Sequence, residues 1–479
     1  MSQSHSQSAE ELKKRFFAKL TSIIQTQNLH CQTTGIAVAY SGGLDSTVLL
    51  ALTSLYAQQE QIPVFAYHIN HGISANALVW QKHCEDTCSK LGIPFRTDQV
   101  VIKNQGKGIE SIARTERYQA LGRLCKIDQV NFLLVAHHLD DQAETMLMQL
   151  FRGTGLRGLA GMDEFNFAPT LLNSPHILIG RPLLSESKNA IQIYANFNQL
   201  RNIEDESNAD LVFTRNATRH LLMPKIEEVF PQFVQRLFRT SVHTRSAQRL
   251  LDELAATDLN ACSENNVLDL TQLLALNADR ISNVFRYWLS INHVQLPSTS
   301  KIAEIQDQLF NAREDARVTI HHGEHSICRY ASKIYLLDQR LVSTHQADIE
   351  FQWSGEPSKY FSELKGTLIF QRGEVGVCVN ILNEKTMVIR RRLGGERLRL
   401  AKNRPTRDMK SHFQSAKIPF WLREKLPFIY IDDQLFFVGL LGVDAAFLVD
   451  EQTEPNGTST KIELTWIPDN RMNLAEVKN

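Results

Sequence analysis

Between residues 35 and 136 the chain alternates regularly between two sequence patterns. Short apolar runs rich in β-branched and aromatic residues are separated by longer segments with the apolar spacing of a helix. The short runs are GIAVAY, VFAYHI, FRTDQVVI and NFLLVA, and the longer segments begin at Asp45, Ala77 and Ile109. This alternation predicts βαβ units and a doubly wound parallel sheet covered by helices on both faces. In such sheets ligands bind at the carboxyl ends of the strands.

Two later segments have different patterns. From about Asn216 to Leu341 the pattern is mainly helical, and after a looser stretch near residues 353–358 short strand-like runs accompany a basic segment. A length of 479 residues is consistent with about three domains of roughly 150 residues each. We therefore predict an α/β domain at residues 1–215, a helical domain at 216–345 and a small α+β domain at 350–479.

Composition restricts the class of protein. Hydrophobic residues make up 43% and charged residues 22% of the chain, as in soluble globular proteins. The N-terminus lacks the apolar core of a secretory signal, and the apolar run from Phe436 is interrupted by Asp444 before it reaches the roughly 18 to 20 residues of a membrane span. Seven scattered cysteines do not form a disulfide framework, and we interpret Cys84 and Cys88 as buried structural thiols rather than ligands of a metal. We expect a cytoplasmic protein that does not contact a membrane.

The polar break SGGLDS, from Ser41 to Ser46, interrupts an apolar run. If a strand precedes it and a helix follows it, the two glycines let the backbone approach a ligand, and amides at the helix N-terminus bind phosphate. The local sequence is equally compatible with a tight βα turn in which Asp45 or Ser46 is a helix N-cap. The lysine of a Walker A loop is absent, which argues against a kinase or a GTPase.

A second polar group follows the run FLLVA. Asp141 and Glu144 are three residues apart at the start of a predicted helix, which places two carboxylates on one face at the ligand end of the sheet. The same D-x-x-E spacing is typical of a structural capping box. His137 and His138 end the preceding strand, where a histidine bonded to the backbone is common.

A pair of arginines precedes these groups in the run IARTERY. Arg114 and Arg117 are three residues apart on one predicted helix, so they form either an anion site or an exposed basic face with Tyr118 packed inward. Arg114 is the better candidate for a phosphate contact.

Several of these segments together resemble a known family. SGGLDS resembles the loop of N-type ATP pyrophosphatases, and within that superfamily the match is closest to the tRNA(Ile)-lysidine synthetases. The segments that carry the resemblance are HINHGI at His68, IARTERY at Ile112, AHHLDDQAETMLMQLFRGTGLRGL at Ala136, RPLL at Arg181, DESNADLVFTRNATRHLL at Asp205, RRRLGGERLRL at Arg390 and KIPFWLREKLPF at Lys417. The resemblance covers nearly the whole chain, and Thr218 stands where an aliphatic residue is commoner.

The resemblance implies a reaction, its substrates and its site. ATP adenylates the C2 oxygen of the wobble cytidine in an isoleucine tRNA with a CAU anticodon, and the ε-amine of free L-lysine then displaces AMP to give lysidine. The implied ATP site comprises Ser41, Gly42, Gly43, Leu44, Asp45 and Ser46, with Asp45 holding Mg²⁺. The implied catalytic residues are Asp45, Arg114, His137, Asp141 and Glu144. Asp141 and Glu144 bind or deprotonate the amine, and His137 contacts nucleotide phosphate.

A local excess of cations predicts where an overall neutral chain binds tRNA. Lys plus Arg equals Asp plus Glu at 52 each, but between Lys385 and Lys425 thirteen Lys and Arg residues face three acids, a balance of 13 − 3 = +10. The helical segment repeats the bias with Arg236, Arg239, Arg245 and Arg249. These cations would touch backbone phosphates. Alternatively, they solvate the outside of a domain whose core contains Phe413, Phe420 and Trp421. A homodimer is also allowed.

Alternative functions and sites have weaker support in the sequence. A cytidine thiolase would need a paired catalytic cysteine near the loop, and an amidotransferase-type synthetase would need a cysteine after Met1, where Ser2 stands. An inactive tRNA-binding protein would not need Asp45, Asp141 and Glu144. The run GTGLRG follows a predicted helix rather than a strand, so it lacks the context of a dinucleotide fingerprint and is interpreted as a mobile loop near the site. HHGEH at His321 lies in a β-rich stretch without the helix that a zinc motif requires.

Overall fold

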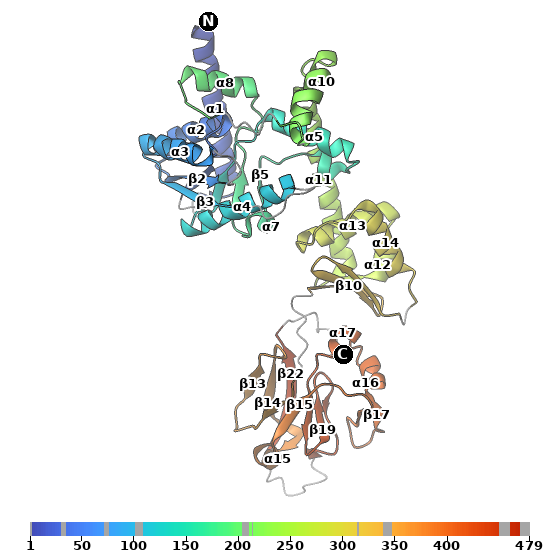
Figure 1. Ribbon diagram of the computed structural model, residues 1–479. Helices are drawn as coiled ribbons and strands as arrows, with labels where there is room; N and C mark the ends of the chain where they lie inside the picture. The colour runs from blue at the N-terminus through green and yellow to red at the C-terminus, as the bar shows by residue number, and fades with distance from the viewer. Residues whose placement is uncertain are drawn as a thin grey trace. The chain divides into compact units, whose positions relative to one another are not determined.

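The computed structural model describes residues 2–29, 35–70, 76–100, 109–203, 210–212, 214–313, 316–338, 347–449 and 460–469 (Figure 1). Contacts divide the chain into two units, Met1–Leu251 and Asp252–Asn479. Cys31 and parts of the HINHGI and DESNADLVF segments lie outside the described residues. The three predicted domain ranges stay predictions.

A six-stranded sheet forms the centre of the first unit. Its strands are β1 (Ile36–Ala39), β2 (Val64–Asn70), β3 (Phe95–Gln99), β4 (Phe132–Leu134), β5 (Phe165–Phe167) and β6 (Leu178–Gly180). The strand order is β3-β2-β1-β4-β6-β5, and every pairing is parallel except that of β5 with β6. The doubly wound parallel sheet is therefore confirmed, with an antiparallel edge strand that the sequence patterns did not reveal.

Helices cover both faces of this sheet, as Figure 1 shows. Residues of β1 alternate between two cores, because Ile36 and Val38 belong to one hydrophobic cluster and Ala37 to the other. The first cluster includes residues of α1 (Ser2–Thr26), α2 (Leu44–Glu60), α3 (Ala77–Leu91) and α8 (Lys188–Phe197). The second includes residues of α4 (Ile109–Ile127) and α7 (Pro169–Leu172). The loops at the carboxyl ends of the parallel strands thereby lie between the two layers of helices, where ligands bind in this fold.

The remaining helices of this unit form a smaller core. They are α5 (Leu139–Phe151), α6 (Leu156–Leu159), α9 (Thr214–Ala217), the π-helix η3 (Thr218–Leu222), α10 (Met223–Val229) and α11 (Phe233–Cys262). Ala143 and Leu147 of α5 pack with Met223 and Phe233 in one buried cluster. This packing fixes α5, which follows β4, against the segment that contains α9 and η3.

The second unit begins with a helical segment that contains more strand than the sequence patterns predicted. Its helices are α12 (Leu270–Leu274), α13 (Ala278–Ile291) and α14 (Thr299–Phe310). A five-stranded sheet accompanies them in the order β7-β8-β11-β10-β9, formed by Ser263–Glu264, Val267–Asp269, Lys333–Asp338, His325–Tyr330 and Val318–His322. The β-rich stretch around His321 is confirmed, but the description of residues 216–341 as mainly helical overlooked the extent of this sheet.

The rest of the second unit consists of antiparallel sheets with three short helices. Its strands are β12 (Ile349–Phe351), β13 (Ser358–Phe361), β14 (Gly366–Cys378), β15 (Met387–Arg390), β16 (Arg397–Leu398), β17 (Arg407–Asp408), β18 (Phe428–Ile431), β19 (Gln434–Val438), β20 (Gly442–Val443), β21 (Leu448–Val449) and β22 (Lys461–Pro468). Its helices are α15 (Val379–Glu384), α16 (Met409–Ser415) and α17 (Phe420–Arg423). Phe413 is fully buried, whereas the Trp421 ring packs against Tyr330 and Tyr335. No helix in the described ranges is long and apolar enough to cross a membrane.

Candidate active site

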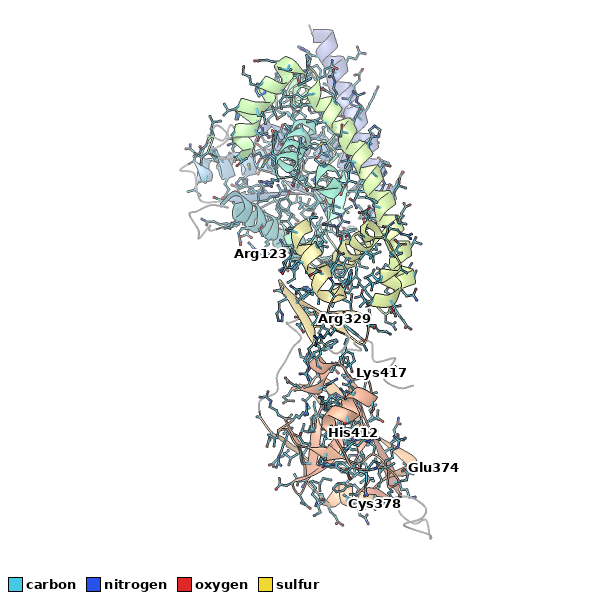
Figure 2. All side chains as sticks on the ribbon, turned by 90° about the vertical axis from the view of Figure 1, so that its right-hand side faces the viewer. Arg123, Arg329, Glu374, Cys378, His412 and Lys417 are labelled. Carbon is cyan, nitrogen blue, oxygen red and sulfur yellow. The ribbon has the colours of Figure 1, made fainter. Side chains whose placement is uncertain are left out.

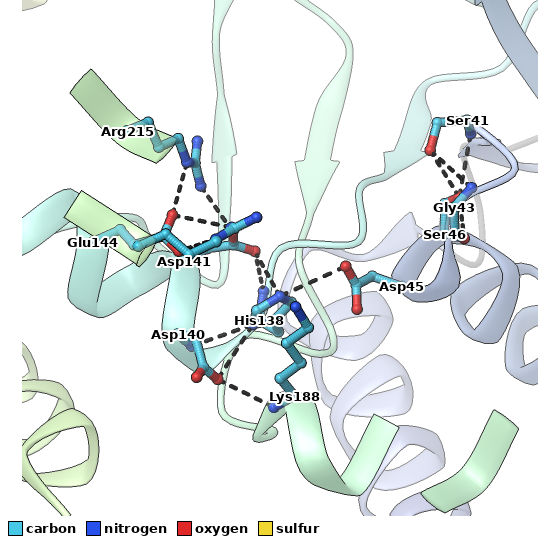
Figure 3. Close-up of polar contacts among 11 residues, drawn as sticks. Ser41, Gly43, Asp45, Ser46, His138, Asp140, Asp141, Glu144, Lys188 and Arg215 are labelled. Atoms are coloured by element: carbon cyan, nitrogen blue, oxygen red, sulfur yellow. Dashed lines mark hydrogen bonds and ion pairs between the residues drawn. The ribbon is translucent and has the colours of Figure 1, made fainter. Parts of the chain in front are cut away.

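The SGGLDS segment turns directly from β1 into α2. Gly42 has φ 85°, and a Cβ there would lie 2.9 Å from the Cys84 sulfur, so both the backbone and the helix beneath require glycine. Gly43 is the N-cap of α2 and supplies no side-chain bond to the first turn, so the alternative with Asp45 or Ser46 as N-cap is wrong. The Ser46 hydroxyl donates to Gly43 O and lies 3.0 Å from Ser41 Oγ. The loop is thus held by its own hydroxyls, as Figure 3 shows.

Cys84 and Cys88 pack beneath this loop in α3. Both are fully buried, which confirms their predicted burial. Burial raises the pKa of each thiol to about 12. At neutral pH they are therefore unreactive thiols that fill space under the loop.

Asp45 connects the loop to α5. Its Oδ2 lies 3.6 Å from His138 Nε2, across the gap between the two halves of Figure 3. Its Oδ1 is buried and has no hydrogen-bond partner among the described residues. Burial raises the pKa of Asp45, and the nearby His138 ring opposes that rise. A buried carboxylate oxygen without a partner is costly unless a ligand completes it.

His138 begins α5 through a capping box. The Asp140 N–H donates to His138 Nδ1, and the His138 N–H donates to Asp141 Oδ2 at 2.9 Å. The capping box is therefore formed by His138 and Asp141, and the predicted alternative of Asp141 with Glu144 is wrong. With Nδ1 accepting, the Nε2 proton points toward Asp45 and Asp141.

Two arginines that were not predicted bind the acidic pair. Arg215 donates to Asp141 at 2.8 Å and to Glu144 at 2.9 Å, and Arg219 donates to both carboxylates at 2.9 and 2.5 Å. The Glu144 side chain is 0% exposed. Burial would raise the pKa of Asp141, but His138 and Arg215 hold it well below its usual range. Asp141 therefore stays ionised at all ordinary pH values.

A second group of cations lies beside this cluster. The guanidinium carbons of Arg114 and Arg117 lie 5.1 and 5.5 Å from the ring centroid of Tyr118, which is buried as predicted. Arg117 is not on an exposed basic face, and burial lowers its pKa. Arg181 is 6% exposed and donates through Nη1 to Asp163 O and Asn166 Oδ1. His137 follows β4, whose parallel neighbour β6 precedes Arg181, and burial holds the pKa of His137 well below its ordinary value.

The loop after α5 is fixed from two sides. The Gln142 amide donates to Met162 O at 3.1 Å and accepts from Met162 N at 2.8 Å. Arg245 of α11 donates to Ala160 O and Met162 O, so this arginine, predicted to meet RNA phosphate, is engaged within the protein. The GTGLRG run that precedes Ala160 follows helix α5, which confirms that it lacks the context of a dinucleotide fingerprint.

The HHGEH segment forms the turn between β9 and β10. His321 Nδ1 lies 3.0 Å from Ser326 Oγ, and His322 Nε2 lies 2.7 Å from Gln295 O. Within the described ranges no group of three or more His, Cys, Asp or Glu side chains could hold a metal ion.

Comparisons with known proteins agree with this arrangement. A PP-loop domain model matches residues 12–226, a TilS substrate binding domain model matches residues 268–335, and a TilS substrate C-terminal domain model matches residues 387–458. The chain is 34% identical over 402 residues to the tRNA(Ile)-lysidine synthase of Coxiella burnetii, covering 84% of this chain and 87% of that protein. It is 33% identical over 448 residues to that of Nitrosomonas europaea, covering 90% and 92%, and 35% identical over 428 residues to that of Legionella pneumophila, covering 88% and 94%.

Proposed function

This chain belongs to the tRNA(Ile)-lysidine synthase family of ATP-dependent ligases, and we propose that its first unit joins free L-lysine to the wobble cytidine of an isoleucine tRNA with a CAU anticodon. The observation that carries the proposal is the proximity drawn in Figure 3, where Asp45 of the PP loop reaches the helix that holds Asp141 and Glu144. A phosphate-binding loop and a pair of carboxylates thereby share one site. Adenylation of the cytidine and attack by an amine need those two groups together.

The PP loop would bind the ATP phosphates. Ser41, Gly42, Gly43, Leu44, Asp45 and Ser46 surround the N-terminus of α2, where backbone N–H groups and the helix dipole favour anions. Gly42 lets the backbone approach the ligand, and the Ser41 and Ser46 hydroxyls hold the loop in shape. The expected result is a triphosphate oriented for loss of pyrophosphate.

Asp45 fits a Mg²⁺ ion. Its buried Oδ1 lacks a hydrogen-bond partner in the described part of the chain, and an unpaired carboxylate oxygen is the donor that Mg²⁺ prefers. When bound, the ion would neutralise charge on the leaving pyrophosphate. Asp45 would hold the ion, while His138 restrains the direction of the carboxylate from the other side.

The acidic pair would receive the lysine amine. A free ammonium with a pKa near 10.4 must lose a proton before it can attack. Asp141 is a poor base because His138 and Arg215 hold its pKa low, so its role would be to attract and orient the cation. Glu144 lies beside it, and the incoming amine would displace a guanidinium of Arg215 or Arg219 from these carboxylates.

Arg114 and His137 would contact a phosphate of the nucleotide, as the family resemblance implies. The basic segment Lys385–Lys425 would bind tRNA backbone phosphates in the second unit. A cytoplasmic location and a homodimer are part of the same proposal.

One reaction mixture tests the function. Protein, ATP, Mg²⁺, labelled lysine and isoleucine tRNA with a CAU anticodon should give labelled tRNA, AMP and pyrophosphate. Asp45→Ala and Ser46→Ala should each slow pyrophosphate release by about 100-fold or more, because they remove groups that position the triphosphate. Asp86→Ala removes an exposed carboxylate from α3 and serves as the control. If both loop variants release pyrophosphate at the rate of the parent protein, the assignment of this loop as the ATP phosphate site is contradicted.

A further inference from the structure

The first turns of α5 and α8 cap each other. The N–H of Leu139, the first residue of α5, donates to Glu186 O at 2.9 Å. The N–H of Lys188, the first residue of α8, donates to Asp140 Oδ2 at 3.1 Å. The first amides of a helix have no partner within that helix, so each contact satisfies a donor that would otherwise be left over. The placement of α5 therefore depends on the segment around Glu186.

An arginine of α1 holds that segment. Arg15 donates from Nε and Nη2 to the two carboxylate oxygens of Glu186, at 2.9 and 2.8 Å, which makes a bidentate pair. The Glu186 side chain is 8% exposed, whereas that of Arg15 is 52% exposed. Figure 1 shows α1 alongside α8, the helix that follows Glu186. A nearly buried carboxylate that loses its cation must move or take up a proton.

The first turn of α5 is the part of the candidate site that this pair supports. His138 at the N-cap lies 3.6 Å from Asp45, and Asp141 belongs to the same turn. Movement of the Glu186 segment would therefore shift the acidic pair relative to the PP loop. A misplacement of about 1 Å can lower the rate of a reaction by about 100-fold, even when its cause lies far from the reacting atoms. Arg15 lies outside the site, since its ion pairs within the described ranges are with Glu186 and with a glutamate of its own helix.

We propose that Arg15 and Glu186 are positioning residues for lysidine formation, which hold the first turn of α5 in register with the PP loop. This inference rests on the proposed function. The alternative is a pair that merely fastens α1 to the rest of the unit, and its loss would then lower stability without changing turnover. Positioning instead predicts a loss of kcat at a nearly unchanged KM for ATP, because the PP loop begins α2 and not the supported turn.

The test measures lysidine formation at saturating lysine and tRNA while ATP is varied. Arg15→Gln should lower kcat by about 10- to 100-fold and change KM for ATP by less than about twofold. Arg15→Lys, which keeps the charge without the guanidinium fork, should recover part of the loss. The double variant Arg15→Gln with Glu186→Gln should be faster than Arg15→Gln alone, because it leaves no buried charge without a partner.

Amide hydrogen exchange reports the position of the turn without any turnover. In Arg15→Gln the amides of Leu139 and Lys188 should exchange about tenfold faster than in the parent protein, because the two reciprocal caps open more often. Peptides that cover the first turns of α5 and α8 give this readout by mass spectrometry. The measurement needs no ATP, lysine or tRNA.

Two variants are matched controls. Arg123 of α4, labelled in Figure 2, is also 52% exposed and also donates from Nε and Nη2 to a carboxylate, that of Asp98 on the edge strand β3. Lys19 forms a further ion pair between α1 and the body of the unit, with Glu164 at 2.7 Å. Arg123→Gln and Lys19→Gln should each keep kcat within about twofold of the parent value, because pairs at this exposure contribute little and neither carboxylate belongs to the segment that caps α5.

The outcomes are distinguishable. An unchanged kcat in Arg15→Gln overturns the positioning role, and so does an equal loss of kcat in Lys19→Gln, which would identify the fastening of α1 as the cause. Exchange in the first turn of α5 at the parent rate also overturns it. A parent protein that attaches no lysine to tRNA overturns the proposed function and the role in catalysis with it, while the exchange rates alone then decide whether Arg15 holds α5.

Discussion

Arginines meet carboxylates in both units of this molecule, and the surroundings of two such groups differ. In the first unit Arg215 and Arg219 bind Asp141 and Glu144, whose side chains are 9% and 0% exposed. In the second unit Arg390 meets Asp433 at 2.7 Å, but that carboxylate is 81% exposed. Charges in a buried site interact strongly, and removing one partner leaves the other charge buried and destabilises the fold. Water and salt screen the exposed pair, so its loss costs little stability. The buried pairs therefore shape a site, while exposed arginines can exchange a carboxylate for an RNA phosphate at little cost.

The fold also changes the charge count on which the tRNA surface was predicted. The window Lys385–Lys425 carries a balance of +10 in sequence. Asp432 and Asp433 lie outside that window, yet they pair with Lys385 and Arg390 across the sheet. The net positive charge at this surface is therefore lower than the count of +10 from the sequence window implies. Arg391 is exposed and makes no ion pair with a described residue, so it is the cation of that cluster most available to a phosphate.

The largest effect should come from breaking the buried cluster. Asp141→Asn and Glu144→Gln should each lower lysidine formation by about 100-fold or more, because the site loses a negative charge that attracts the incoming amine. Each should also destabilise the first unit by about 3 kcal/mol, since two guanidiniums lose a buried partner. Rates measured with saturating ATP and melting temperatures test both effects. Asp433→Asn in the exposed pair is the control and should change neither.

The pH dependence of stability sharpens the same comparison. The pKa of Asp141 is depressed by His138 and Arg215, so its contribution to stability is present above the unfolded pKa of about 3.9 and is lost as pH falls through the folded value. Asp141→Asn should therefore be less stable than the parent at pH 7, and the difference should shrink below about pH 4. A difference that is constant from pH 7 to pH 3 would contradict the ionic role of Asp141.

Removal of the whole basic region should affect the first unit less than the substitutions of the acidic pair do, but it should clearly weaken tRNA binding. Deleting residues 350–479 should leave ATP binding by the first unit largely intact and weaken tRNA affinity by about tenfold or more, since fewer phosphates are then neutralised. Equilibrium titrations of ATP and of tRNA measure the two effects separately. The deletion also exposes Tyr330 and Tyr335, which pack on Trp421, so Trp421→Ala in the full chain controls for that change. Full tRNA affinity in the truncated chain would exclude this region from the binding surface.

The smallest effect should come from the exposed arginines themselves. Replacing Arg390, Arg391 and Arg392 with Ala should weaken tRNA binding and flatten its dependence on salt, by about one unit of slope for each phosphate that is no longer neutralised. Among single variants, Arg391→Ala should account for more of the change than Arg390→Ala, because Arg390 is shared with Asp433 and Asp348. Titrations at several salt concentrations measure both quantities. Unchanged slope and affinity in the triple variant would remove this cluster from the tRNA surface.

Local patterns predicted the first sheet well. The four predicted strands correspond to β1, β2, β3 and β4 within a few residues. Strands β1, β2 and β4 are mostly buried, and buried parallel strands produce continuous apolar runs. The sheet around β10 was underestimated, since β7 spans only two residues and β8 only three. Strands that short leave almost no periodic signal in a sequence.

The candidate site was predictable only in its local parts. The turn at Ser41 and the spacing of Asp141 and Glu144 are short-range features, and the structure places them side by side. The partners of the acids are far away in sequence, with Arg215 separated from Glu144 by 71 residues. The four-residue spacing of Arg215 and Arg219 was a signal that two guanidiniums share a helix face. Nothing local indicated which carboxylates they would meet.

The π-helix η3 carries a consequence for how this protein can change over evolutionary time. Its Met223 N–H reaches back to Thr218 O, so the turn holds one residue more than an α-helix would. The buried Thr218 hydroxyl donates to Thr214 O, which shows that a polar side chain can be accommodated there. Because the wide turn absorbs the additional residue, deleting one residue there would restore a regular α-helical turn and leave the helix that follows in nearly the same orientation. Relatives should therefore tolerate a difference of one residue in the length of this segment without displacement of α10.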